Sequence, residues 1–148
     1  MRILHTLLIM FVGSFIVQYF LMSAVMSNNI LNIRNSIGKA YLATIMGLFM
    51  VLIEIGMHDN HYTIFSTKYY VVFGGLLLLF IYLYKIQYAI KDRQYLEEMI
   101  EHHSMAILTS NEILKKTDSY DVSKIAKNIL QTQKDEILEM KNLLKKVK

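Results

Sequence analysis

The chain contains no cysteine and no proline, and its last glycine is Gly75. Without cysteine there can be no disulfide bond, no zinc ribbon and no thiolate metal site, and the sequence does not reveal the redox compartment. Because no proline or glycine follows residue 75, nothing in the second half of the chain interrupts a helix. The sequence therefore favours an all-α protein.

Charged residues are scarce in the first part of the chain. Residues 1–90 carry five basic and two acidic side chains, whereas residues 91–148 carry eleven basic and ten acidic ones. Most of the formal net charge of +4 thus comes from basic residues that flank apolar runs. The nearly neutral second part has no basic stripe, which is the usual sign of nucleic-acid binding. We expect no nucleic-acid partner.

Three apolar runs, at about 3–27, 40–57 and 69–90, are each long enough to cross a membrane. The first run is too long for the apolar core of a signal peptide, and no cleavage site of small residues follows it. We therefore predict a three-span transmembrane region over residues 1–90, with membrane lipid as its partner. Residues 91–148, here called the tail, form a second domain.

Three crossings place the N-terminus and the loop 58–68 on one side of the membrane, and the loop 28–39 and the tail on the other. The second side carries more basic residues, namely Arg34, Lys39, Lys85, Lys91 and Arg93, against Arg2 and Lys68 on the first. Because basic residues accumulate on the cytoplasmic side, we predict a multi-pass membrane protein with a cytoplasmic tail.

The spans contain polar and sulfur-bearing side chains that need interpretation. Glu54, His58 and His61 share one helical face, either as a functional intramembrane group or as hydrated residues where the span ends. Met46 and Met50 form a Met-x-x-x-Met pair, which is similar to one in the second span of three-span copper transporters. Thioethers select Cu(I), but methionine is also a flexible apolar filler.

The tail carries two amphipathic stripes at helical spacing. The first stripe is Leu96, Met99, Ile100, His103, Ala106, Ile107, Ser110, Ile113 and Leu114, and the second is Val122, Ile125, Ala126, Ile129, Gln133, Glu136, Met140, Leu143, Leu144 and Val147. A polar turn at 116–121 separates them, with Ser119 or Asp121 available as a helix cap. We predict an antiparallel helical hairpin. We also predict that its first helix continues directly from the third span.

The register of this hairpin brings polar residues together. Pairing about residue 118 places His103 level with Gln133 and Glu136, and Met99 level with Met140. Imidazole and carboxylate from facing helices are a common metal-binding arrangement in helix bundles. The same layer could instead be a hydrogen-bonded pair that fixes the register of the two helices.

Two motifs closely resemble domain-of-unknown-function family 305. They are Met-Ile-x-His-His-x-x-Ala-Ile at 99–107 and Ala-x-x-Ile-x-x-x-Gln-x-x-Glu-Ile-x-x-Met at 126–140. The family is ferritin-like and helical, and some of its members bind copper. This chain departs from the family pattern at Glu101, where a proline usually precedes the His pair, and it carries the motif once. The tail would thus be half of a ferritin-like four-helix bundle, completed by self-association into a homodimer or larger oligomer.

The resemblance implies metal ligands at five positions: His102, His103, Glu136, Met99 and Met140. The predicted function is an integral membrane protein whose tail binds a metal for copper binding, handling or sensing, with another divalent metal left open. One alternative is a structural membrane protein without metal, and a second is a small Met-rich copper channel. No nucleophile elbow, phosphate loop or catalytic carboxylate pair is present, so we expect no enzyme.

Overall fold

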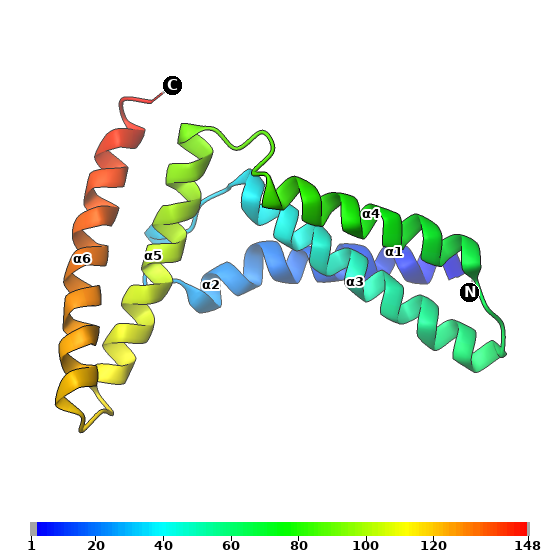
Figure 1. Cartoon of the computed structure of the whole chain (residues 1–148), viewed down its shortest axis with the longest axis horizontal. Coiled ribbons are helices and arrows are strands. Elements are labelled where there is room, and N and C mark those ends of the chain that lie inside the picture. The colour runs from blue at the N-terminus through cyan, green and yellow to red at the C-terminus, as the bar shows by residue number, and fades with distance from the viewer. Residues whose placement is uncertain (1–2, 148) are drawn as a thin grey trace. The chain divides into compact units, whose positions relative to one another are not determined.

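The computed structural model describes residues 3–147, which form helices joined by short connections (Figure 1). The elements are α1 (Ile3–Ile16), a π-helical segment (Val17–Leu21), α2 (Met22–Met26), a 3-10 turn (Ile30–Asn32), α3 (Ile37–Tyr62), α4 (Thr67–Lys85), α5 (Asp92–Leu114) and α6 (Tyr120–Leu144). No strand occurs between residues 3 and 147, so the predicted all-α class is confirmed.

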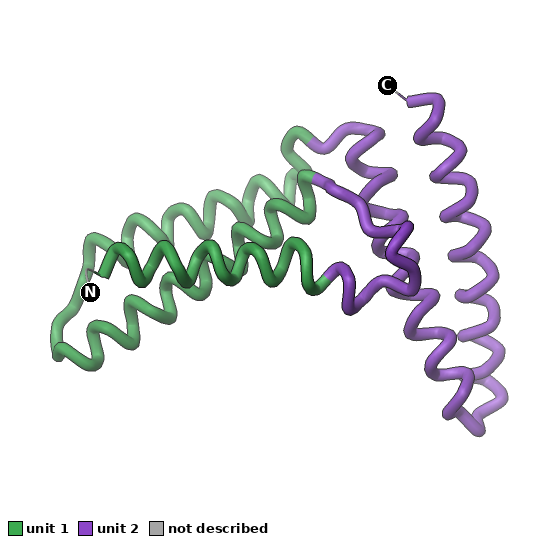
Figure 2. The backbone as a smooth tube through the Cα atoms, turned by 180° about the vertical axis from the view of Figure 1, so that it is seen from behind, with its two compact units in different colours: residues 1–22, 37–89 green, residues 23–36, 90–148 purple. Residues whose placement is uncertain are grey.

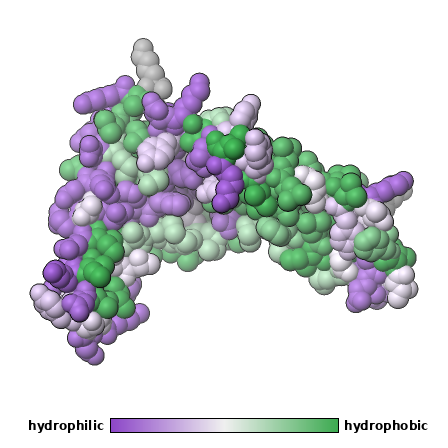
Figure 3. All heavy atoms as spheres, viewed as in Figure 1, coloured by the Kyte–Doolittle hydropathy of each residue, from purple (hydrophilic) through white to green (hydrophobic). Residues whose placement is uncertain are grey.

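Three helical stretches are long and apolar enough to cross a membrane: Ile3–Met26, Ile37–Tyr62 and Thr67–Lys85. The first stretch comprises α1, the π-helical segment and α2. Hydrophobic residues dominate the visible surface of the membrane-spanning helices, whereas hydrophilic residues dominate that of the tail helices (Figure 3). The three predicted spans are therefore present as helices. The second helix runs past the predicted end at 57, and the third stops before 90.

The chain folds into two compact units (Figure 2). The membrane unit contains the residues up to Met22 together with Ile37–Ala89. The tail unit contains Ser23–Ser36 together with the residues from Ile90 onward. Residues 23–36, which lie early in the sequence, thus belong structurally with the tail helices.

In the membrane unit, α1 and α4 both pack against α3. Leu7, Val51 and Ile55 form its buried apolar cluster. Gly47 on α3 allows α1 to approach closely, because a Cβ atom there would lie only 2.8 Å from the Cδ2 atom of Phe11. The absence of a side chain at this position therefore sets the packing distance between α1 and α3.

The tail unit is built on the antiparallel pair α5 and α6, as predicted. The buried side chains between the two helices are Leu96, Ile100, Ile107, Ile137 and Met140. Ser119 begins α6 by accepting a hydrogen bond from the backbone N–H of Val122 at 3.4 Å. Its hydroxyl satisfies one of the amide groups left free at a helix start.

The predicted continuous helix from the third span into the tail is wrong. α4 ends at Lys85 and α5 begins at Asp92, so six residues separate them. Gln87 and Ala89 adopt left-handed φ angles of 53° and 58°. The N–H of Tyr88 donates back to the carbonyl of Leu83 at 3.0 Å, which closes the helix end in a Schellman-type turn without glycine.

Candidate metal centre

A histidine on α5 faces a glutamate on α6. The Nδ1 atom of His103 lies 3.1 Å from the Oε2 atom of Glu136. Gln133, one turn earlier on α6, donates a hydrogen bond from Nε2 to the same oxygen at 3.2 Å. The three side chains share one level of the hairpin, which confirms the predicted register. This geometry suits both roles that the sequence leaves open, a pair of metal ligands and a pair that fixes register.

The imidazole of His103 is largely enclosed by protein. Its side chain is 16 % exposed, against 44 % for Glu136. Among residues 3–147, its buried Nδ1 atom finds no hydrogen bond of good geometry, so the contact with Glu136 is electrostatic only. Burial lowers the pKa of His103, as does the charge of His102, and the carboxylate of Glu136 opposes both. The neutral imidazole, which is the form that binds metals, therefore prevails near pH 7.

Met99 and Met140 lie in the core of the hairpin. Met140 is 9 % exposed and belongs to the buried cluster between α5 and α6, and Met99 packs against that cluster. Flexible thioether side chains fill irregular apolar spaces well. Both residues therefore have a packing role in the folded tail in addition to their predicted place as ligands.

His102 occupies a different face of α5 from His103. Successive residues on a helix are about 100° apart, and His102 is exposed. Burial raises the pKa of Glu98, four residues earlier, while a charge on His102 lowers it and Glu101 raises it further. A charge on His102 therefore interacts with the carboxylate of Glu98. The two predicted His ligands point in different directions.

A single chain supplies an incomplete set of ligands. Within residues 3–147, no three His, Asp or Glu side chains come close enough together to hold a metal ion. Protein zinc and copper sites commonly use three or four ligands. A complete site built on His103 and Glu136 therefore needs thioether ligands or a second copy of the chain.

A buried polar cluster on α5 escaped the sequence reasoning. Ser104 is 0 % exposed, and its Oγ atom accepts hydrogen bonds from the backbone N–H of Asn28 at 3.0 Å and from Asn32 Nδ2 at 3.2 Å. The hydroxyl of Ser27 lies 2.8 Å from the same atom. The sequence could have indicated that Ser104 is buried, because it lies four residues after Ile100, on the same face of the predicted helix.

The cluster extends to both tail helices. Glu101 accepts hydrogen bonds from the Ser23 hydroxyl at 2.5 Å and from the backbone N–H of Arg34 at 2.9 Å. Lys141 on α6 donates from Nζ to Asn32 Oδ1 at 2.5 Å. Burial lowers the pKa of Lys141, and the charge of Arg34 adds to this effect. Residues 23–36 therefore cover one side of the hairpin and bind it through polar groups.

Asp59 and His58, near the end of α3, form polar contacts that stabilise the connection to α4. Asp59 is 5 % exposed and accepts hydrogen bonds from the backbone N–H and the hydroxyl of Ser66 at 2.5 and 2.7 Å. His58 Nδ1 lies 3.3 Å from Asp59 Oδ1. These contacts close the connection between α3 and α4, where the chain reverses.

The chain resembles known proteins in both its parts. Residues 82–144 match the model of the family described as Domain of unknown function (DUF305). An uncharacterized protein of Acanthamoeba polyphaga mimivirus is 30 % identical over 138 residues, which is 93 % of this chain and 90 % of that protein. An alignment of that extent includes the membrane-spanning helices as well as the tail. No solved structure matches the chain significantly.

The family match covers the whole of α5 and α6, where His103 meets Glu136, and the viral relative aligns with nearly the whole chain. The predicted resemblance is thus confirmed, and the chain belongs to the DUF305 family.

Proposed function

We propose that this chain is a multi-pass membrane protein whose tail binds a metal ion, with copper as the best chemical match. The observation that carries the proposal is the contact between His103 on α5 and Glu136 on α6. A largely buried imidazole whose Nδ1 atom lacks an aligned hydrogen bond is available for ligation. Imidazole suits copper, the nearby thioethers of Met99 and Met140 favour Cu(I), and the carboxylate also admits harder divalent ions.

We further propose that a second copy of the chain completes the site. An apolar groove of about 330 Å³ runs between α5 and α6, and its walls include Ile113, Val122 and Ile129. Ile113 is nine residues after Ser104, so it lies on the side of α5 opposite to the one that residues 23–36 cover. Ile129 precedes Glu136 by two helical turns on the same stripe. A second hairpin seated along this groove would bring its own His103 and Glu136 towards the first pair.

The role that we propose is binding rather than catalysis, with the metal held, delivered or sensed next to the membrane. The methionine pair of α3 gives less support to a channel. Met46 is 43 % exposed on the membrane unit and does not line its apolar cavity. We therefore place the metal in the tail.

Copper titration of the full chain in detergent tests this proposal. Replacing His103 or Glu136 by alanine should weaken binding at least tenfold, equivalent to about 1.4 kcal/mol. His61→Ala, an exposed histidine of the membrane unit, and Glu139→Ala, an exposed carboxylate on α6, are matched controls that should bind normally. Copper should also raise the melting temperature of the wild-type chain, since a ligand that binds only the folded form stabilises it.

Two results would contradict the metal-binding role. Equal copper affinity in all variants would remove His103 and Glu136 as ligands. A loss of about 1–3 kcal/mol of stability in each variant, with no response to metal, would identify them as a structural pair. Sedimentation of the detergent complex tests self-association separately, and a monomer at all concentrations would contradict the second-copy proposal.

A further inference from the structure

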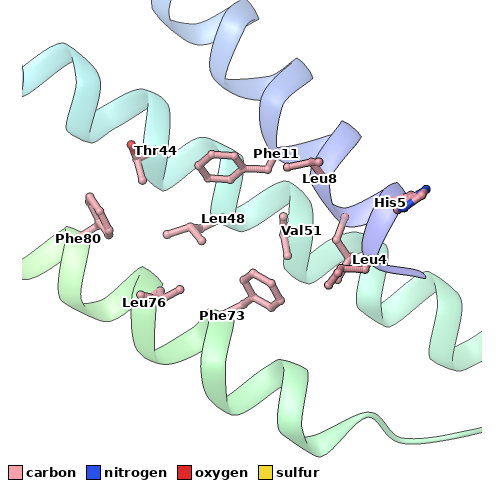
Figure 4. A pocket seen from close by; sticks show the side chains of 11 residues that line it. Leu4, His5, Leu8, Phe11, Thr44, Leu48, Val51, Phe73, Leu76 and Phe80 are labelled. Atoms are coloured by element: carbon pink, nitrogen blue, oxygen red, sulfur yellow. The ribbon is translucent and has the colours of Figure 1, made fainter. Parts of the chain in front are cut away.

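One side of the membrane unit is hollowed between α1, α3 and α4 (Figure 4). The cavity has a volume of about 580 Å³. Phe11 reaches towards it from α1, Leu48 from α3 and Leu76 from α4. Because α1 and α4 both pack on α3, the groove has α3 as its floor and the other two helices as its walls.

The groove offers almost no polar group to an occupant. Its lining is apolar except for Thr44 and His5. The hydroxyl of Thr44 already donates to the carbonyl of Ala40 at 2.8 Å, so it needs no further partner. His5 lies at one end of the groove, with its ring at the edge of the group of lining side chains (Figure 4). The occupant must therefore be a hydrocarbon along most of its length.

The groove has a limited length along the helix axes. Each helix lines it over eight residues, at 4–11, 44–51 and 73–80, which corresponds to about 10 Å along a helix axis. This length is enough for several methylene groups of a hydrocarbon chain, which needs no polar partner along it.

We propose that this groove holds an acyl chain of a membrane phospholipid as a retained ligand. The proposal rests on the proposed membrane location of the chain. The groove begins near the start of α1 at Ile3 and extends about 10 Å, within the roughly 15 Å that one leaflet of hydrocarbon provides. A lipid whose headgroup lies at the level of His5 can thus place its chain between α1 and α4.

Native mass spectrometry of the full chain with a dibrominated phosphatidylcholine tests the proposal. The wild-type chain in mild detergent should retain one lipid molecule. Leu8→Trp fills the groove from the α1 wall and Leu76→Trp from the α4 wall, and each should weaken retention at least tenfold. Leu78→Trp is the matched control, because Leu78 is 69 % exposed on α4 and does not line the groove.

A wild-type chain that retains no lipid would overturn the proposal, as would equal retention in all four proteins, which indicates ordinary carry-over. A wild-type dimer that dissociates in the groove variants would assign the groove to a second copy instead. Fractionation of expressing cells separates this result from the location on which it rests. If the wild-type chain is absent from the membrane fraction, the proposed location fails before the lipid site is tested.

Discussion

The hydroxyl of Ser104 is fully enclosed by protein, and three groups from residues 23–36 converge on it. Buried polar groups cost free energy unless they are hydrogen-bonded, and the buried amide of Asn32 donates to the serine oxygen. One small side chain thereby attaches a distant segment of the chain to α5.

Replacing Ser104 by alanine should lower the free energy of unfolding of the tail unit by about 1–3 kcal/mol, because the buried amide of Asn32 loses its acceptor. Chemical unfolding of the full chain in detergent, followed by circular dichroism, measures the effect. Ser110→Ala is the matched control, since Ser110 is also buried on α5 but faces the groove beside α6. Equal losses in both variants would show that burial alone, and not the contact with residues 23–36, sets the cost.

The lowered pKa of His103 predicts a pH dependence of stability in the metal-free chain. Burial disfavours the imidazolium, so the unfolded chain, with a histidine pKa of about 6.5, takes up the proton first. The contribution of the neutral, buried imidazole to stability is therefore complete above about pH 6.5 and is lost as the pH falls below that value. NMR titration should show a pKa of His103 below the ordinary histidine value of about 6.5.

Two substitutions check this sign. Glu136→Gln removes the carboxylate that raises the pKa of His103, so the pKa should fall further. His103→Gln should abolish the loss of stability on acidification. A His103 pKa above 6.5 in the wild-type chain would contradict the assignment of burial as the dominant influence.

The pairing of His103 with Glu136 could be predicted from the sequence, because helical spacing and a short turn fix the register of a hairpin. The partners of Ser104 could not, since they lie 72 to 77 residues earlier in the chain. No local periodicity links such distant segments. The exposure of His102 could not be predicted from the sequence either, because a residue at the edge of the apolar stripe can point towards the core or towards solvent.

At the level of elements, the contact between α1 and α3 depends on Gly47. Gly47→Ala should destabilise the membrane unit by about 1–3 kcal/mol, because the new methyl group would meet the ring of Phe11 at 2.8 Å and its carbonyl oxygen at 3.2 Å. Thermal unfolding in detergent measures the loss. Gly74→Ala is the control, since no atom beyond its chain neighbours and the nearby backbone of its own helix lies within 4 Å of a Cβ there. Equal melting temperatures for both variants would show that α1 adjusts without cost.

The element boundaries show where the sequence misleads. Apolar length identified the three spans and amphipathic spacing identified α5 and α6. The break between α4 and α5 was missed because Gln87 and Ala89, which are not glycines, adopt the left-handed conformation. That conformation costs roughly 1–2 kcal/mol for an ordinary residue, and helix propensity alone therefore predicts continuation. Tertiary contacts such as the hydrogen bond from the Tyr41 hydroxyl to the carbonyl of Tyr88, at 3.0 Å, favour the turn instead.

For the whole molecule, the contacts between residues 23–36 and the tail require both to lie on the same side of the membrane. Single cysteines at the exposed positions Ile30 and Asp118 should therefore react with a membrane-impermeant thiol reagent from one side, and a cysteine at Thr63 from the other. The natural chain contains no cysteine and serves as the blank. Labelling of intact cells, in which the reagent reaches only the outer side of the membrane, also tests the predicted cytoplasmic tail. Labelling of all three positions from one side would contradict an arrangement of three crossings.

The polar attachment of residues 23–36 has a consequence for biosynthesis. Ser27 and Ser104 are 77 residues apart, so at roughly 5–20 residues per second the serine of α5 is made about 4–15 s after its partner. During that interval α3 and α4 must be translated and placed in the membrane. The serine and asparagine side chains that later contact Ser104 can stay hydrated until α5 is synthesised, whereas a purely apolar contact surface would be exposed to aggregation during that time.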